Sequence, residues 1–188
     1  SPSLNETGEW AKSSAAEYVV TRMDRESRWI KSFYLSPTRE TAPDFKPGQH
    51  LPIYLPVEPG QDPILRTYTL SQSPGKSELR LTVKREERGF GSVYLHDRVK
   101  VGDRLLAKEP SGDFVLDTES ERPVVLLSAG VGITPMLSML QYLVQQQPER
   151  QVYFLHGARS VGDHALRSEV EALKAARVKI HFRYSQPE

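Results

Sequence analysis

The sequence predicts two domains: a six-stranded antiparallel Greek-key β-barrel, followed by a doubly wound parallel α/β domain. Up to about residue 121, short runs rich in β-branched and aromatic residues alternate with Pro, Gly, Asp and Ser. Beyond that point, apolar strand patterns alternate with helical patterns, which is typical of a parallel sheet. A chain of 188 residues has room for two such domains.

The first part of the chain is expected to form the barrel. Turn segments such as Pro47-Gly48 and Ser73-Pro74-Gly75 separate its strands. Many short antiparallel strands favour a closed barrel, because closure removes the unpaired edges of an open sheet. The expected strands are 18–23, 30–35, 50–55, 66–70, 79–84 and 104–108, and a short helix is expected at 92–96.

The second part is expected to form the α/β domain. Its first strand, 124–128, is almost wholly apolar, which suits a sheet buried on both faces. A helix follows, then a strand at 151–156, a helix at 164–175 with Asp163 as candidate N-cap, and a strand at 178–184. Three strands make a thin sheet, so we expect this domain to be truncated at its C-terminal end. The expected divisions are 1–12 as a tail or linker, 13–118 as the barrel and 119–188 as the partial α/β domain.

Composition excludes several classes of protein. The formal charge of +1 and the mixed charge runs give no sign of a nucleic-acid partner. No apolar stretch approaches the roughly 18 residues of a membrane span, and the N-terminus lacks the pattern of a signal peptide. Cysteine is absent, which excludes disulfides and thiolate-held clusters within this chain. We therefore expect a cytoplasmic protein with no membrane partner.

Histidine and tryptophan carry no metal or ligand pattern. His96, His164 and His181 lack metal-ligand spacing with acidic partners, so no metal site is expected and each is predicted to be hydrogen-bonded or solvated. Trp10 and Trp29 are expected to anchor packing.

The segment Gly130-Val131-Gly132-Ile133-Thr134-Pro135 joins the first strand of the second domain to its first helix. Glycine allows a ligand to approach the backbone closely, and proline suits the first turn of a helix. The N–H groups at that helix start can hold a pyrophosphate. The motif lacks the third glycine of the dinucleotide fingerprint, and a strand–helix turn that needs glycine for geometry alone would look the same.

The strand segment Arg66-Thr67-Tyr68-Thr69 combines a cation, an aromatic ring and hydroxyls. Arg66 and Tyr68 point to one side of the strand and Thr69 to the other. Arg66 can bind a phosphate through two hydrogen bonds, Tyr68 can pack on a planar ligand, and Thr69 can donate a hydrogen bond. A half-buried strand with a surface arginine is the simpler interpretation of this segment alone.

A third segment runs from Val83-Lys84-Arg85 through the glycine turn to His96. A strand ends in basic residues, and a short helix then opens with its amides and the Ser92 hydroxyl expected to face outward. That arrangement suits an anion. A charged surface loop with a serine cap is an equally good interpretation.

Together the three segments resemble the ferredoxin–NADP reductase superfamily, most closely the reductase half of flavohaemoglobins. Connecting segments such as Pro47-Gly48-Gln49 and Val101-Gly102-Asp103 match as well, and the resemblance covers about residues 16 to 187. It implies that Arg66, Tyr68 and Thr69 bind the flavin of FAD. It implies an FAD pyrophosphate site at Val83, Lys84, Arg85, Gly91, Ser92 and Val93. Gly130, Val131, Gly132, Ile133, Thr134 and Pro135 would take the nicotinamide nucleotide.

The implied activity is that of an FAD-dependent NAD(P)H oxidoreductase module. It would take a hydride from the nicotinamide onto FAD and pass single electrons to a haem, iron–sulfur or ferredoxin-like acceptor. By analogy, the Thr69 hydroxyl lies near the flavin N5 and Thr134 lies where the nicotinamide loop approaches the flavin, so both are candidate catalytic residues. Arg159 can pair with the 2′-phosphate of NADPH, but the resemblance favours NADH.

The sequence departs from the family in three places. His50 stands where tyrosine is common; its imidazole can contact the adenine half of FAD or be a plain strand histidine. The globin domain of flavohaemoglobins is missing. So are the last strands of the nucleotide domain, with their Cys-Gly-Pro-like segment and C-terminal aromatic residue. A non-catalytic FAD-carrying electron-transfer or interaction subunit is therefore the alternative, and a scaffold without flavin is a third.

Overall fold

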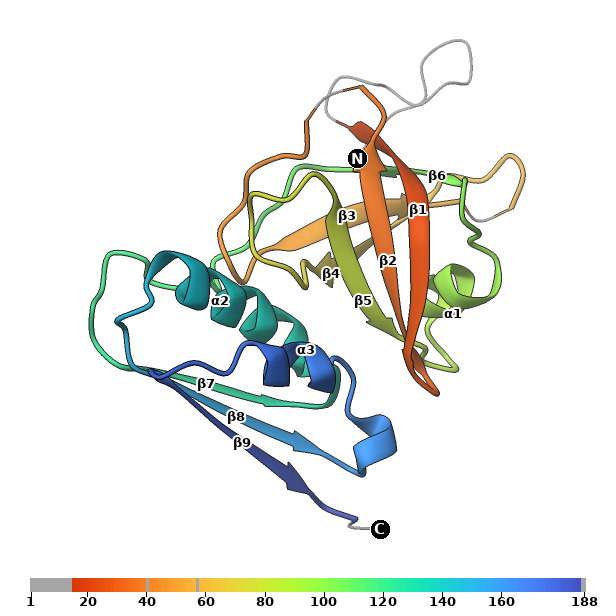
Figure 1. The fold of residues 1–188 in the computed structure, drawn as a ribbon. Helices are drawn as coiled ribbons and strands as arrows, with labels where there is room; N and C mark the ends of the chain where they lie inside the picture. Colours follow the sequence, from red (N-terminus) through yellow and green to blue (C-terminus); the bar gives the residue numbers. More distant parts are fainter. Residues whose placement is uncertain (1–14, 40, 57, 187–188) are drawn as a thin grey trace.

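A computed structural model describes residues 15–39, 41–56 and 58–186. The predicted tail, with Trp10, lies outside these described residues. The chain forms a curled antiparallel sheet next to a smaller parallel sheet with two helices (Figure 1). Both parts of the predicted fold class, antiparallel barrel then parallel α/β, are confirmed. The domain boundary at 118 and 119 stays a prediction.

The first domain is a six-stranded sheet in the order β4-β3-β6-β1-β2-β5, and all its pairings are antiparallel. Its two outer strands meet at one isolated bridge, between Leu70 and Leu81, so the barrel closes at a single point rather than along a ladder. The strands are β1 (Ala16–Ser27), β2 (Ile30–Pro37), β3 (His50–Leu55), β4 (Ile64–Thr69), β5 (Leu79–Lys84) and β6 (Arg104–Ala107).

Alternating apolar side chains fill the barrel. The largest include Tyr18, Phe33 and Leu51, each at most 2% exposed. Helix α1 (Phe90–Asp97) adds Leu95 to this core, and its His96 Nε2 lies 2.7 Å from the carbonyl oxygen of Val83 on β5. The helix is therefore fastened to the strand that precedes it.

The second domain contains the parallel strands β7 (Val124–Ala129), β8 (Val152–Ala158) and β9 (Val178–Tyr184), in that spatial order. Helices α2 (Ile133–Gln146) and α3 (Arg167–Ala172) lie on the same face of this sheet (Figure 1). The three strands have the same order in space and in sequence. Right-handed crossovers between such strands place both connecting helices on one side of the sheet. Among the described residues nothing covers the other face, where Val125 and Leu127 are 60% and 67% exposed. The expected burial of this strand on both faces was wrong for this part of the chain.

The predicted helix at 164–175 is shorter than expected, and Asp163 does not cap it. Asp163 ends the short 3-10 helix η2 (Val161–Asp163), and its carboxylate accepts a hydrogen bond from the Ser160 hydroxyl at 3.0 Å. His164 and the two residues after it are buried, and Leu166 adopts a left-handed φ of 60°. The chain thus turns into the core before α3 begins, because these side chains are drawn against the sheet.

The two domains share part of a hydrophobic core. Ile30 of β2 and Leu116 pack with residues of α2 and β8. Gly48, whose φ is 108°, brings its backbone so close to α2 that a Cβ would lie 2.7 Å from Met139 Cε. Among the described residues, no helix is long and apolar enough to cross a membrane.

Candidate functional site

Strand β4 and the start of α1 converge on one glycine. A Cβ added to Gly91 would lie 2.8 Å from both Arg66 Cγ and Tyr68 Oη, and 3.2 Å from Leu55 Cδ1. Arg66 is exposed and Tyr68 is half-buried. The structure therefore joins the Arg66–Thr69 strand to the third predicted segment, and only glycine leaves room for the two side chains. We call Arg66, Tyr68 and Gly91 the barrel cradle.

Tyr68 offers a neutral phenol in this cradle. Burial raises the pKa of its hydroxyl, so the ring stays uncharged near pH 7 and can donate a hydrogen bond. Thr69 follows it, half-buried, and pairs with His50 of β3.

His50 packs on the backbone at the end of the barrel. A Cβ at Gly112 would lie 3.1 Å from the imidazole Cδ2 and Nε2, and the φ of Gly112 is 124°. The Nδ1 atom lies 3.4 Å from the Ser111 hydroxyl. The imidazole of His50 is partly buried, and it fits there because residue 112 is glycine. Its contact with adenine stays a prediction.

Ser92 and Arg85 of the third segment make hydrogen bonds within the barrel domain. The Ser92 hydroxyl turns inward, accepts the Glu86 N–H at 2.9 Å and lies 3.2 Å from the Gly89 carbonyl oxygen. It does not face outward, because the turn itself needs this partner. Arg85 is held by two hydrogen bonds to the Asp97 carboxylate, at 2.8 and 3.1 Å.

Val83 is also committed to the fold, since its side chain is 2% exposed in the barrel core. Val93 donates its N–H to the Gly89 carbonyl. Of the six residues predicted around the FAD pyrophosphate, only Gly91 belongs to the barrel cradle and only Lys84 lines the pocket described next.

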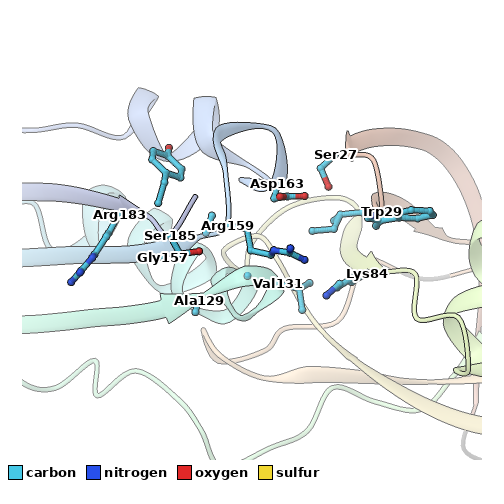
Figure 2. Close-up of a pocket in the computed structure, with 14 residues that line it drawn as sticks. Ser27, Trp29, Lys84, Ala129, Val131, Gly157, Arg159, Asp163, Arg183 and Ser185 are labelled. Atoms are coloured by element: carbon cyan, nitrogen blue, oxygen red, sulfur yellow. The ribbon is translucent and has the colours of Figure 1, made fainter. Parts of the chain in front are cut away.

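A pocket of about 800 Å³ lies where the carboxyl ends of β7, β8 and β9 face the β1–β2 hairpin of the barrel (Figure 2). In parallel α/β sheets this edge is the usual ligand site. The residues that line it are Ser27, Trp29, Ile30, Lys84, Ala129, Gly130, Val131, Gly157, Ala158, Arg159, Asp163, Arg183, Tyr184 and Ser185.

Four of these residues were predicted as site residues: Lys84, Gly130, Val131 and Arg159. The barrel side of the pocket was missed, because no sequence signal places the β1–β2 hairpin beside the second sheet. Trp29 was expected to anchor packing, but it is 40% exposed and lines the pocket. The strand-end rule points to Ala129, Gly157 and Tyr184 once the parallel strands are recognised.

Cations from both domains line the pocket. Lys84 ends β5 of the barrel and Arg159 follows β8, and both side chains are exposed. In Figure 2 the Arg159 side chain extends across the pocket toward the side that carries Lys84 and Trp29. Asp163 is the one acidic residue among the lining residues. The pocket therefore suits a ligand that carries negative charge.

The two glycines of the Gly130–Pro135 segment have different reasons to be glycine. Gly130 has a left-handed φ of 56°, so its conformation favours glycine. Gly132 has an ordinary φ of −60°, and a Cβ there would meet no described atom within 4 Å beyond its immediate neighbours. Geometry alone thus explains the first glycine but not the second. Open space at Gly132 fits a ligand that approaches the backbone.

The rest of this segment begins helix α2. Ile133 is fully buried in the core, and the Thr134 hydroxyl donates to the Val131 carbonyl at 3.2 Å. Pro135 lies in the first turn, as predicted. The Thr134 hydroxyl therefore holds the shape of the loop.

Two buried histidines are chain neighbours of pocket-lining residues: His156 precedes Gly157, and His164 follows Asp163. The Nδ1 of His156 lies 2.8 Å from the Ser128 hydroxyl, the Nδ1 of His164 lies 2.9 Å from the Tyr184 hydroxyl, and the ring centroids are 4.6 Å apart. Both Nε2 atoms are buried without a partner among the described residues. Burial lowers the pKa of each to about 4, so both are neutral at pH 7. His164 is hydrogen-bonded through Nδ1 alone, His96 is hydrogen-bonded and His181 is exposed.

Comparison with known proteins shows the family of this chain. The oxidoreductase FAD-binding domain matches residues 18–116, and the oxidoreductase NAD-binding domain matches residues 126–187. The flavohaemoprotein of Bacillus subtilis is 45% identical over 172 residues, which are 90% of this chain and 43% of that protein. The chain thus spans less than half the length of this relative.

Solved structures show the same fold. The FAD/NAD-binding domain of nitric oxide dioxygenase from Vibrio cholerae has a TM-score of 0.84 and 36% identity, covering 91% of this chain and 74% of that one. Phthalate dioxygenase reductase has a TM-score of 0.79 and 27% identity, covering 92% and 53%.

The fold and the site define a flavin-dependent oxidoreductase module that uses a nicotinamide nucleotide. The chain belongs to the family of FAD- and NAD-binding oxidoreductases, within the ferredoxin–NADP reductase superfamily. The predicted superfamily and cofactors are confirmed.

Proposed function

We propose that this chain takes a hydride from NADH onto FAD and passes single electrons to a haem or iron–sulfur acceptor. The observation that carries the nucleotide part of the proposal is the shared pocket. Lys84 from the barrel and Arg159 from the second domain line one cavity, beside an unobstructed Gly132. A dinucleotide is an anion long enough to span such a boundary between two domains.

The barrel cradle is the proposed flavin site. Arg66 would neutralise phosphate, Tyr68 would pack on the ring system, and Gly91 leaves the space they need. Thr69 would hold the flavin by a hydrogen bond. Ser92 acts through the turn that it braces, not as a free donor. FAD supplies the ability to accept a hydride and release electrons singly. Because direct hydride transfer needs alignment more than proton abstraction, no general base is required.

The pocket is the proposed nicotinamide-nucleotide site. The N–H groups of the turn Gly130–Gly132, which leads into α2, would bind the pyrophosphate. Thr134 fixes their loop through its bond to Val131. Arg159 and Asp163 line the same pocket, so positive charge there is partly balanced. We favour NADH over NADPH for this reason, together with the resemblance to NADH-using enzymes.

The acceptor is proposed from the relatives. The matched relatives are flavohaemoproteins, and phthalate dioxygenase reductase is described as transferring electrons from pyridine nucleotides to a [2Fe-2S] centre. A haem domain is the acceptor most consistent with the higher identity to flavohaemoproteins. A cytoplasmic location belongs to the same proposal.

An anaerobic visible spectrum of the purified chain, loaded with FAD and titrated with NADH and then NADPH, tests the proposal. Flavin bands that bleach, and bleach at lower NADH concentration, are the expected result. Bands that persist with both nucleotides would favour the alternative of a non-catalytic FAD-carrying subunit. A chain that retains no FAD would contradict both.

A further inference from the structure

A buried arginine of the barrel binds a carboxylate of the second domain. Arg80 on β5 is 3% exposed, and its Nη1 lies 2.7 Å from Glu169 Oε2 on α3. The same guanidinium donates to the hydroxyl and the carbonyl of Ser71, at 2.9 and 2.6 Å. Two hydrogen bonds within the barrel thus fix the guanidinium of Arg80, which also binds Glu169 of the second domain.

The carboxylate extends the chain of hydrogen bonds back to the barrel. Glu169 Oε1 accepts from Gln141 Nε2 at 2.6 Å, and Gln141 Oε1 accepts the N–H of Ser73 at 2.8 Å. The contacts form a ring through two domains: β5, α3, α2 and the loop after β4. We call Arg80, Glu169, Gln141 and Ser73 the interdomain network.

One face of α2 carries these contacts. Thr134, Ser138 and Gln141 recur at i, i+4 and i+7, so they share a face of the helix. The Ser138 hydroxyl donates to the Gln72 carbonyl at 2.6 Å, one residue before Ser73. This face of α2 therefore contacts the loop that follows β4. The first turn of α2 is continuous with the loop that begins at Gly130.

We propose that Arg80 and Glu169 are positioning residues that set the nicotinamide loop against the flavin strand. The inference rests on the proposed function, since it concerns the same two sites. Neither residue lines the pocket or belongs to the barrel cradle. They act through Gln141 and Ser73, which fix α2 relative to the end of β4. Hydride transfer is sensitive to such placement, because small displacements of the reacting partners slow it steeply.

Stability alone is a poor explanation for this arrangement. Burying the Arg80 guanidinium costs desolvation of its charge, and apolar residues of the same volume often stabilise a fold equally well. The ion pair fixes the orientation of α3 relative to β5 and α2, since one carboxylate oxygen of Glu169 binds Arg80 on β5 and the other binds Gln141 on α2. Arg80 is unsuitable as the first variant, because its loss would strip Ser71 of its partner inside the barrel. Glu169 is partly exposed and can be changed.

The test compares Glu169→Gln with Glu171→Gln in the FAD-loaded chain. Glu171 lies on the same helix and pairs with Arg167 at the surface, 3.0 Å away, so the control removes the same charge from a pair within one domain. We expect Glu169→Gln to speed hydrogen exchange at the Ser73 amide about tenfold, because local opening becomes easier. The flavin should then bleach about 10- to 100-fold more slowly at saturating NADH.

FAD content and the Kd for NADH should be unchanged in Glu169→Gln, and Glu171→Gln should match the wild type throughout. Gln141→Leu, which breaks the neutral half of the network, should shift exchange and bleaching in the same direction. A bleaching rate that stays at the wild-type value while Ser73 exchanges faster would contradict the positioning role. If hydrogen exchange at the Ser73 amide is unchanged in Glu169→Gln and in Gln141→Leu, the network itself is contradicted. A wild-type chain that never bleaches would instead contradict the proposed function, and the exchange result would still decide whether the network joins the domains.

Discussion

Gly91 stands so close to Tyr68 that a methyl group on its Cα would lie 2.8 Å from the phenol oxygen. The contact joins strand β4 to the first turn of α1, and we propose that both contribute to the FAD site. It also makes the barrel cradle sensitive to the addition of a single carbon atom.

Gly91→Ala should therefore weaken FAD binding. The methyl group would displace Tyr68 and Arg66, the two side chains that the proposed flavin site uses. The Kd for FAD should therefore rise about tenfold, which corresponds to about 1.4 kcal/mol of binding free energy. Titration of the apo chain with FAD, followed by flavin fluorescence, measures this. Gly162→Ala is the matched control, because its Cβ would meet nothing closer than Ser160 Oγ at 3.8 Å. Equal Kd values in the two variants would remove Gly91 from the flavin site.

Gly132→Ala should separate ligand binding from stability. With an ordinary φ and open space, alanine should be neutral or stabilise the fold by about 0.4–1 kcal/mol. Binding of NADH should nevertheless weaken, because the methyl group occupies the space above the loop. Gly130→Ala should behave in the opposite way and lower stability by about 1–2 kcal/mol, since its φ is left-handed. Urea unfolding and NADH titration of both variants decide the point; unchanged NADH affinity in Gly132→Ala would favour a purely geometric loop.

The buried histidine pair should make stability fall in mild acid. Burial lowers the pKa of His156 and of His164 to about 4, from 6.5 in the unfolded chain. Between these values the unfolded chain binds more protons than the folded one, so the free energy of unfolding falls as pH falls from about 6.5 toward about 4. The full loss is on the order of a few kcal/mol.

Urea unfolding at a series of pH values measures this slope. His164→Phe should make the slope shallower but not abolish it, because one of the two titrating rings is removed and His156 remains. A slope in His164→Phe as steep as in the wild type would show that other groups cause the pH dependence.

Arg159 should matter more for NADPH than for NADH. Its exposed side chain reaches across the pocket, where a 2′-phosphate adds charge that NADH lacks. Arg159→Ala should raise the KM for NADPH about tenfold, the usual size of one lost charge-assisted contact, and the KM for NADH less. Arg177→Ala, at an exposed position away from the pocket, is the control. Equal effects on both nucleotides would place Arg159 on the pyrophosphate or outside the site.

Local pattern predicted the elements well where one physical preference dominated. Strands β3 and β5 have the predicted bounds, because their apolar side chains alternate between turns. Pattern failed where a tertiary contact decided the outcome. The Ser92 hydroxyl points inward because it accepts the backbone N–H of Glu86. The helix expected to start after Asp163 begins only at Arg167, because His164 is buried against the sheet.

Only those parts of the candidate site that are contiguous in the sequence could be predicted. The loop from Gly130 to Thr134 and the strand from Arg66 to Thr69 carry recognisable residue types. The barrel wall of the pocket, with Trp29, depends on how two domains dock, and short-range pattern holds no signal for that. Arg80 and Glu169 are 89 residues apart in the chain, so their pairing could be seen only in the structure.

The most direct test of hydride transfer in this chain is the anaerobic rate at which NADH bleaches the FAD-loaded protein, measured with ordinary NADH and with NADH deuterated at the transferred position. We expect bleaching by both, clearly slower with the deuterated nucleotide, because the hydride moves from nicotinamide to flavin within this chain. FAD that is retained but not bleached by either nucleotide would contradict it.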